Sequence, residues 1–432
     1  MGAHFGTDGI RGVAGEQLTA RTAFALGNAL CRLHKRPLVL IGQDTRTSSD
    51  MLSLALAAGV TAGGGEAVLC GVLPTAAVAF FVRKRGAQFG AVVSASHNPP
   101  EFNGLKVFDG QGYKLAEESE ARAEQYFDEY SFAPPLACGR AYRLKNRGAY
   151  LDFLVSCCDK PLAGRTFVLD CANGAAGAFA PRAFRALGAK VIALSCGRSG
   201  RDINVKCGAL HPEQLAAAVL QQGADAGFCY DGDADRLIAL DEKGVPVDGD
   251  KLLCILASDL KEKGRLPKDL AVGTSHTNTG AERWLEKRGI SLARTDIGDK
   301  YVAACMRKSG AAVGAEQSGH VILSEYSTTG DGILTSLKIA EKLGEKPLSA
   351  WADIPLFPQY NVSVRVKDKV RVLGNEGVCE VIERARAGVD RLMVRASGTE
   401  PVVRIFAEAE TLSAARRAAD AVRRGILRSE VE

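Results

Sequence analysis

The sequence predicts an α/β fold, with three similar α/β domains that have mixed, mostly parallel sheets and a smaller C-terminal α+β domain. Two observations predict it. A unit of strand, polar or glycine-rich loop, helix, glycine and strand occurs three times along the chain, and such units form parallel sheets with crossover helices. The segment after residue 358 has a different pattern. A length of 432 residues also favours two to four domains.

The three repeated units have little sequence identity with one another, so their order of elements is the signal. Each has an apolar run, then a polar or glycine-rich loop, a helical pattern, a glycine and a second run typical of a strand. The strand, helix and strand segments are 38–41, 51–62 and 67–69 in the first unit, 166–169, 179–187 and 190–194 in the second, and 270–273, 281–288 and 290–293 in the third.

The last segment has alternating runs typical of strands and two helical patterns. Strands are predicted at 360–366, 391–395 and 402–407, and helices at 377–387 and 413–426. Polar or proline-marked stretches near 145–147, 247–250 and 355–358 are candidate linkers. The predicted domains are therefore residues 1–148, 149–250, 251–358 and 359–432.

Composition excludes several classes of protein. The chain is 46% hydrophobic and 24% charged, with a net charge of +5, which is ordinary for a globular protein. It has no dense basic stripe with interleaved aromatics, so we expect no nucleic-acid partner. The apolar runs are shorter than the roughly 18 residues of a membrane span, and the N-terminus lacks a signal-peptide pattern.

The twelve cysteines form no C-x-x-C pair and no regular framework. This pattern favours free or buried thiols over disulfides or a zinc site. We therefore expect a cytoplasmic protein.

The first candidate reactive loop follows the β-branched run at 92–93. Its residues are Ser94-Ala95-Ser96-His97-Asn98-Pro99. Ser96 and His97 are then expected at the exposed end of a strand, where α/β proteins carry their sites. Because Asn-Pro is also an ordinary turn signal, this segment alone does not distinguish a site from a loop.

The second loop, Asp231-Gly232-Asp233-Ala234-Asp235-Arg236, has carboxylates at alternate positions. Three such groups can turn toward one hard cation, Mg²⁺ or Ca²⁺. A solvated acidic turn is less consistent with the strand-like residues on both sides. A calcium EF-hand is also disfavoured, because Arg236 occupies the position where that loop needs glycine.

Three further segments carry polar groups suited to a sugar phosphate. Glu316-Gln317-Ser318-Gly319-His320 offers groups for hydroxyls or an amine. Arg395-Ala396-Ser397-Gly398-Thr399, with Arg404 beyond, has the composition of an anion cradle. The N-terminal Phe5-Gly6-Thr7-Asp8-Gly9-Ile10-Arg11-Gly12 combines glycines with one arginine. The structural alternative is a polar loop for the first segment, a salt-bridged hairpin for the second and a chance glycine-rich loop for the third.

Taken together and in this order, these motifs resemble the α-D-phosphohexomutase superfamily over the whole chain. SASHNP followed by DGDADR is the most specific combination, and FGTDGIRG and EQSGH are most similar to bacterial members that act on glucosamine phosphates. The resemblance implies that the four domains surround a central cleft and that each contributes one motif. It also implies a hexosamine phosphate substrate and a monomer or homodimer.

The resemblance implies a role for each motif. Ser96 would be the phosphoserine and, with Asp231, Asp233 and Asp235, would bind Mg²⁺. The transfer site would be lined by Arg11, His97, Lys106 and Arg236. The sugar phosphate would be held by Glu316, Ser318, His320, Arg395, Ser397, Gly398, Thr399 and Arg404. Lys106 would shuttle a proton if neighbouring cations lower its pKa.

The implied reaction interconverts glucosamine 6-phosphate and glucosamine 1-phosphate through a 1,6-bisphosphate, for amino-sugar and cell-wall synthesis. Ala315, Lys300 and the segment 275–280 depart from the usual family pattern on the sugar side. A glucose or mannose phosphate mutase therefore stays an alternative. A metal-dependent sugar phosphatase and a non-catalytic sensor are alternatives of other classes.

Overall fold

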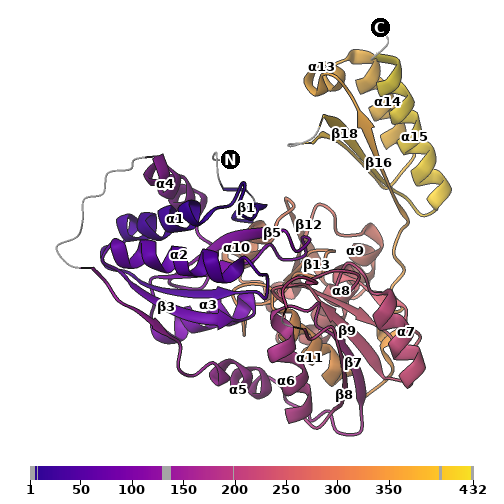
Figure 1. The fold of residues 1–432 in the computed structure, drawn as a ribbon. Coiled ribbons are helices and arrows are strands. Elements are labelled where there is room, and N and C mark those ends of the chain that lie inside the picture. The colour runs from indigo at the N-terminus through magenta and orange to yellow at the C-terminus, as the bar shows by residue number, and fades with distance from the viewer. Residues whose placement is uncertain (1–4, 7, 129–137, 198, 398–400, 430–432) are drawn as a thin grey trace. The chain divides into compact units, whose positions relative to one another are not determined.

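The computed structural model describes residues 5–6, 8–128, 138–197, 199–397 and 401–429. It has two compact units (Figure 1). One comprises residues 1–276 and 288–353, and the other comprises residues 277–287 and 354–432. The segment 277–287 therefore groups with the C-terminal part of the chain, which the linker positions did not predict. The four domain boundaries stay a prediction.

The first sheet contains the first repeated unit. Its strand order is β1-β5-β4-β2-β3-β6, in which β2, β3, β4 and β6 pair in parallel and β5 pairs antiparallel with both β4 and β1. The sequence of β2 is apolar on both faces, as expected of a buried parallel strand. The strands are β1 (Ile10–Val13), β2 (Leu38–Gln43), β3 (Glu66–Val72), β4 (Phe89–Val93), β5 (Phe102–Asp109) and β6 (Ala141–Arg143), and the helices are α1 (Ala20–Leu33), α2 (Ser49–Ala62), α3 (Thr75–Arg85) and α4 (Glu117–Asp128).

Helices α1 and α2 pack closely because each has a glycine at the contact. A Cβ atom on Gly27 would lie 2.2 Å from the Leu56 carbonyl oxygen, and one on Gly59 would lie 2.0 Å from that of Phe24. Leu26, Leu30 and Leu56 complete a fully buried apolar layer beneath them.

The second sheet contains the second repeated unit, in the order β11-β10-β9-β7-β8. Strands β7, β8 and β9 are parallel, and β10 returns antiparallel to β9. Its elements are α5 (Gly148–Ser156), β7 (Thr166–Asp170), η1 (Ala175–Ala178), α6 (Ala180–Ala186), β8 (Lys190–Leu194), α7 (Glu213–Gln222), β9 (Ala226–Tyr230), β10 (Leu237–Leu240) and β11 (Pro246–Val247).

The third sheet has the order β13-β12-β14-β15, in which only β15 is antiparallel to its neighbour. The elements of this part are α8 (Gly249–Glu262), η2 (Pro267–Asp269), β12 (Leu270–Thr274), β13 (Ser291–Thr295), α10 (Asp299–Ser309), β14 (Val313–Ala315), β15 (Val321–Leu323), α11 (Gly332–Lys342) and α12 (Leu348–Trp351). Together the three sheets confirm the predicted repetition of α/β units.

The second compact unit has an antiparallel sheet in the order β16-β18-β17. Apolar residues of its strands pack against α14 and α15, and Val403, Val422 and Ile426 lie in this core. This confirms the predicted small α+β domain. Its elements are α9 (Thr279–Glu286), β16 (Gln359–Arg365), α13 (Lys369–Leu373), α14 (Glu376–Arg386), β17 (Arg391–Ala396), β18 (Val402–Glu408) and α15 (Leu412–Ser429).

Within the described ranges, no helix combines the length and apolar character needed to cross a membrane. The twelve cysteines all lie within the described residues, and none of them is in a disulfide.

Candidate active site

Ser96 lies in the loop that follows β4, where the sequence predicts it. The residue is 1% exposed and has a left-handed backbone, with φ of 55°, which a non-glycine residue rarely adopts. Its Oγ donates a hydrogen bond of 2.5 Å to Asp231 Oδ2 and lies 3.3 Å from His97 Nδ1. The serine hydroxyl therefore faces the aspartate loop of the second sheet.

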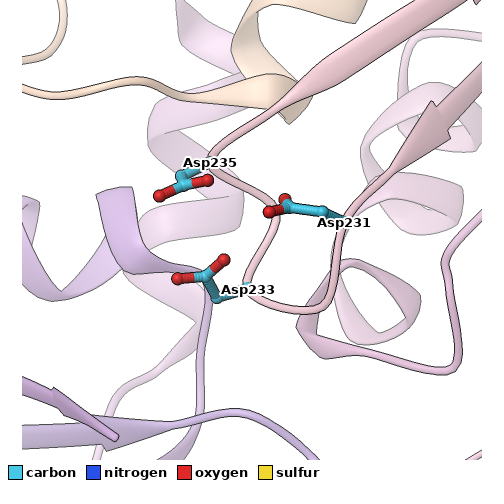
Figure 2. Close-up of side chains that lie close together, drawn as sticks. All are labelled: Asp231, Asp233 and Asp235. Atoms are coloured by element: carbon cyan, nitrogen blue, oxygen red, sulfur yellow. The ribbon is translucent and has the colours of Figure 1, made fainter. Parts of the chain in front are cut away.

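The aspartate loop, residues 231–236, is a tight connection between two antiparallel strands. The pairing of Tyr230 with Leu237 closes it, and Ala234 has a left-handed φ of 59°. Figure 2 shows its three carboxylates, which are buried and each offer an oxygen within 4.8 Å of the others.

The donor set of this loop fits a hard divalent cation. The Oδ1 atoms of Asp233 and Asp235 are buried and have no hydrogen-bond partner among the described residues, and a metal ion would satisfy them. Burial and the neighbouring carboxylates raise the pKa of Asp231 well above its usual value. The three aspartates can therefore bind a metal ion.

Lys106 lies on β5 next to the same carboxylates. Its Nζ is 2.8 Å from Asp233 Oδ2 and 3.0 Å from Asp235 Oδ2. Burial by itself would lower the pKa of Lys106, but the surrounding carboxylates raise it well above its usual value. The prediction that neighbouring cations lower this pKa is therefore wrong for this arrangement. Lys106 is a charged ammonium at neutral pH.

Two arginines form the positive side of the site, and a histidine lies beside them. Arg11 projects from β1, and its Nη1 lies 3.3 Å from Asn98 Oδ1. The Nε atoms of Arg11 and Arg236 are buried without a hydrogen-bond partner among the described residues. Burial, Arg236 and Arg11 lower the pKa of His97 to about 4. The site thus holds unsatisfied guanidinium donors and a neutral imidazole, which suits an anionic ligand.

A row of buried and partly buried charges, not expected from the sequence, lies next to Lys106. Asp8 contacts Arg11 and Lys114 and lies 3.4 Å from Lys106 Nζ. Lys114 Nζ is also 2.7 Å from Asp299 Oδ1. Burial opposes the ionisation of Asp8, but these cations hold its pKa well below its usual value. Asp8 lies in the N-terminal glycine-rich motif, whereas the sequence around Lys114 and Asp299 did not single them out as site residues.

The Glu316–His320 segment lies at the turn before β15. Glu316 is partly buried, and its Oε1 accepts a hydrogen bond of 3.1 Å from the Gly298 N–H. Ser318 is exposed, whereas His320 is 3% exposed and lies 3.4 Å from Asp299 Oδ2. His320 Nδ1 lies 3.8 Å from Asp235 Oδ2, so this histidine joins the charge row to the aspartate loop.

The candidate phosphate-binding residues lie in the second compact unit. Arg395 on β17 and Arg404 on β18 are cross-strand partners, and both are exposed. Ser397 donates its N–H to Val402 O at 2.9 Å, and its carbonyl accepts 2.6 Å from Lys369 Nζ. Gly398 and Thr399 lie outside the described residues. The hairpin therefore presents two neighbouring guanidinium groups on one face.

Family comparisons cover nearly the whole chain. Residues 2–134, 148–244 and 248–356 match the phosphoglucomutase/phosphomannomutase alpha/beta/alpha domains I, II and III. Residues 361–425 match the C-terminal domain of the same family.

Curated relatives agree with this match. A Bacillus subtilis (strain 168) protein named phosphoglucosamine mutase is 44% identical over 426 residues, covering 95% of this chain and 95% of its own. A Geobacillus kaustophilus protein of the same name is 44% identical over 444 residues, covering 98% and 99%.

Solved structures share the fold. A phosphoglucomutase/phosphomannomutase family protein from Burkholderia thailandensis has a TM-score of 0.81 at 26% identity, covering 98% of this chain and 97% of its own. Aspergillus fumigatus N-acetylphosphoglucosamine mutase, solved with GlcNAc-6P and magnesium, has a TM-score of 0.68 at 19% identity, covering 99% and 96%.

Proposed function

We propose, from the premise that the chain belongs to the phosphoglucomutase/phosphomannomutase family, that it interconverts glucosamine 6-phosphate and glucosamine 1-phosphate. The enzyme is an isomerase that works by phosphoryl transfer. Its hexosamine substrate follows from the 44% identity to proteins named phosphoglucosamine mutase. The proposed reaction supplies amino-sugar nucleotide and cell-wall synthesis in the cytoplasm.

The observation that carries the mechanism is the short contact between the Ser96 hydroxyl and the aspartate loop, with Oγ 2.5 Å from Asp231 Oδ2. In the proposed cycle, phosphoserine 96 donates its phosphoryl group to the free hydroxyl of the sugar. The bond from Oγ to phosphorus breaks as the bond to the sugar oxygen forms, and the proton of the sugar hydroxyl passes through the Asp231 carboxylate to Ser96 Oγ, which lies 2.5 Å from Asp231 Oδ2. The resulting 1,6-bisphosphate turns round, and Ser96 takes back the other phosphoryl group.

The proposed metal is Mg²⁺, held by Asp231, Asp233 and Asp235 together with the seryl phosphate. When bound, it would draw negative charge from the transferring phosphoryl group. The proposed part of Arg11 and Arg236 is to donate hydrogen bonds to the same oxygens, because the Nε atoms of both are buried without a partner among the described residues. Each contribution lowers a barrier that, for unaided phosphate-monoester cleavage, requires a reduction of roughly 20 kcal/mol or more.

Two groups are suited to hold protons during the transfer. Asp231 Oδ2 accepts the Ser96 hydroxyl proton in the unphosphorylated state. Lys106 keeps its proton because the nearby carboxylates raise its pKa, so its proposed contribution is a fixed positive charge beside the reacting oxygen.

The remaining proposed contacts concern the sugar. Glu316 and Ser318 would bind its hydroxyl and amine groups, with His320 behind them. The phosphate that is not reacting would be held by Arg395, Ser397, Gly398, Thr399 and Arg404. A loop that recognises a phosphate and not a ring can accept either end of the bisphosphate.

Parallel assays with the 6-phosphates of glucosamine, glucose and mannose test the substrate assignment. The proposal requires the highest kcat/KM for glucosamine 6-phosphate, and a clear preference for either neutral sugar would replace it. A phosphatase would release inorganic phosphate and keep its activity after Ser96→Ala. A sensor would bind the sugar phosphate without turnover.

A further inference from the structure

We propose that Asn204 is a positioning residue for phosphoryl transfer: it ties the backbone of the phosphoserine loop, residues 96–102, to the second sheet and so aims the Ser96 hydroxyl at the aspartate loop. The inference rests on the proposed function, since it concerns the same serine. Asn204 comes from the segment between β8 and α7, and no feature of the sequence marks it.

The side-chain amide of Asn204 binds two carbonyls of the phosphoserine loop. Its Nδ2 donates 2.8 Å to Ser96 O and 3.0 Å to Asn98 O. Its own backbone N–H donates 3.0 Å to the Ala172 carbonyl, just after β7. Asn204 is 9% exposed, so water does not readily replace these bonds. One buried amide therefore joins a loop of the first sheet to the framework of the second.

The aspartate loop packs against the same amide. A Cβ atom on Gly232 would lie 2.7 Å from Ser96 O and 3.2 Å from Asn204 Nδ2. Glycine at 232 thus lets the aspartate loop, the serine carbonyl and the asparagine amide meet directly. A change at Asn204 consequently alters the relation between Ser96 and the three carboxylates.

The first sheet holds the other side of the phosphoserine loop. Arg46 is 2% exposed, and its guanidinium donates to the loop carbonyls of Ser96 (3.1 Å), Asn98 (2.7 Å), Phe102 (2.9 Å) and Pro99. The Ser96 N–H donates 2.9 Å to Ser94 Oγ, which in turn donates 2.6 Å to Asp44 Oδ2. Asn204 donates to this loop from the segment between β8 and α7, on the side of the second sheet that also carries the aspartate loop.

These bonds matter because Ser96 has a strained left-handed backbone, with φ of 55°. Such a conformation persists only where its surroundings fix it. Reacting groups that move by about 1 Å can lose about 100-fold in rate. Losing the Asn204 amide should therefore slow the chemical step and leave sugar binding nearly intact.

The test compares Asn204→Gly with Asn173→Gly. Both asparagines have a left-handed backbone, with φ of 60° and 53°, so glycine removes each amide without adding strain. The Asn173 amide instead donates 3.2 Å to Asp202 O. Each protein is first phosphorylated with glucose 1,6-bisphosphate, with the rate followed by intact mass, and then assayed with glucosamine 6-phosphate.

We expect Asn204→Gly to lower kcat and the rate of Ser96 phosphorylation by about 100-fold, with KM changed less than about threefold. Asn173→Gly should match the wild type in kcat, in KM and in the rate of Ser96 phosphorylation. The positioning role is overturned if Asn204→Gly has the same kcat and the same phosphorylation rate as the wild type. It is also overturned if only KM rises.

The two proposals fail in different ways. If the wild type accepts phosphate on Ser96 but ignores glucosamine 6-phosphate, only the substrate assignment fails, and the phosphorylation rates of the two variants still decide the role of Asn204. If wild-type Ser96 never accepts phosphate, the proposed function fails and the positioning role fails with it.

Discussion

At the scale of single residues, the site is a cluster of buried charges whose balance depends on each member. Lys106 has three carboxylates within 3.4 Å of its Nζ, those of Asp8, Asp233 and Asp235. A buried charge that loses its partner is strongly destabilising, because neither water nor another cation replaces it. Residues of this cluster therefore contribute to stability as well as to chemistry.

Replacing Lys106 by methionine should destabilise the protein and nearly abolish activity. Methionine keeps the length of the side chain but leaves the carboxylates unpaired, which we expect to cost about 3–5 kcal/mol of unfolding free energy. The raised pKa of Lys106 means that its stabilising charge is fully present at neutral pH and is lost only as the pH rises past its usual 10.5. Urea unfolding at pH 7 measures the loss.

The matched control is Lys287→Met, which changes an exposed lysine and should leave the unfolding free energy within about 0.5 kcal/mol of the wild type. Equal stability of Lys106→Met and the wild type would show that the buried carboxylates do not need this cation.

Local sequence predicts residues that carry chemistry better than it predicts their partners. Ser96 and the three aspartates were predicted because small and acidic residues follow strand-like runs. Lys114, Asp299 and Asn204 were not, because each acts through a residue more than 100 positions away in the sequence. The same long-range contacts explain why the expected pKa of Lys106 was wrong: Asp233 and Asp235 come from a different sheet, and Asp8 precedes β1, far from Lys106 in the sequence.

At the scale of elements, the loops after the strands carry the candidate site residues, and the strands fix where those loops begin. The aspartate loop spans only the turn between β9 and β10, whose pairing brings Tyr230 opposite Leu237. The predicted repeats agree with the observed strands because apolar runs and glycine breaks are local signals. The antiparallel pairing of β1 with β5 joins distant segments and was not predicted.

Magnesium should stabilise the folded protein through the aspartate loop. A ligand that binds only the folded state adds about 2.7 kcal/mol at 100 times its Kd, so the thermal midpoint should rise with added Mg²⁺. Asp233→Asn should remove most of that rise, because it removes a charged ligand. Differential scanning calorimetry with and without Mg²⁺ measures both midpoints.

Asp152→Asn, an exposed change on α5, should keep the full response to Mg²⁺. If Mg²⁺ raises the thermal midpoint of Asp233→Asn as much as that of the wild type, the metal binds at another site.

The N-terminus of α11 should make stability depend on pH. Asp331 caps this helix by accepting from the Leu334 N–H, and it also accepts 2.7 Å from Tyr150 Oη. Burial raises the pKa of Asp331 from 3.8 to about 6. The protonated form of Asp331 therefore contributes about 3 kcal/mol to the free energy of unfolding, relative to the ionised form. This contribution is fully present below pH 4 and is lost as the pH rises through 6.

Asp331→Asn keeps the shape of the cap and cannot ionise. Its unfolding free energy, measured in urea between pH 5 and 7.5, should therefore rise relative to that of the wild type. Asp368→Asn, at the exposed N-cap of α13, is the control and should show a much smaller change. Parallel pH profiles for Asp331→Asn and the wild type would contradict the shifted pKa.

At the scale of the whole molecule, the chain divides its work between two compact units. The first contains Ser96 and the three aspartates that can bind a metal ion, and the second contains the arginine pair of β17 and β18. The sequence predicts a separate C-terminal domain from its change of pattern. It does not predict that residues 277–287 belong with that domain, because Asn278 makes this connection through two hydrogen bonds to the Phe357 backbone.

Replacing Arg395 by alanine should weaken sugar-phosphate binding and leave Ser96 chemistry intact. A hydrogen bond to a charged group is worth about 1.5–3 kcal/mol, so kcat/KM should fall about 10- to 150-fold, mainly through KM. Steady-state kinetics measures this change, and Arg384→Ala, an exposed change on α14, is the control. A pure loss of kcat would show that Arg395 acts in the chemical step.

If Ser96 is a reusable phosphate carrier, as proposed, the phosphorylated protein is detectable by intact-mass measurement after incubation with glucose 1,6-bisphosphate and Mg²⁺. The wild type should gain the mass of one phosphoryl group and should lose it to excess glucosamine 6-phosphate with formation of the bisphosphate. Ser96→Ala should gain no phosphoryl group. Phosphorylation of Ser96→Ala to the same extent, or a wild type that never gains the group, would contradict the proposed role of Ser96.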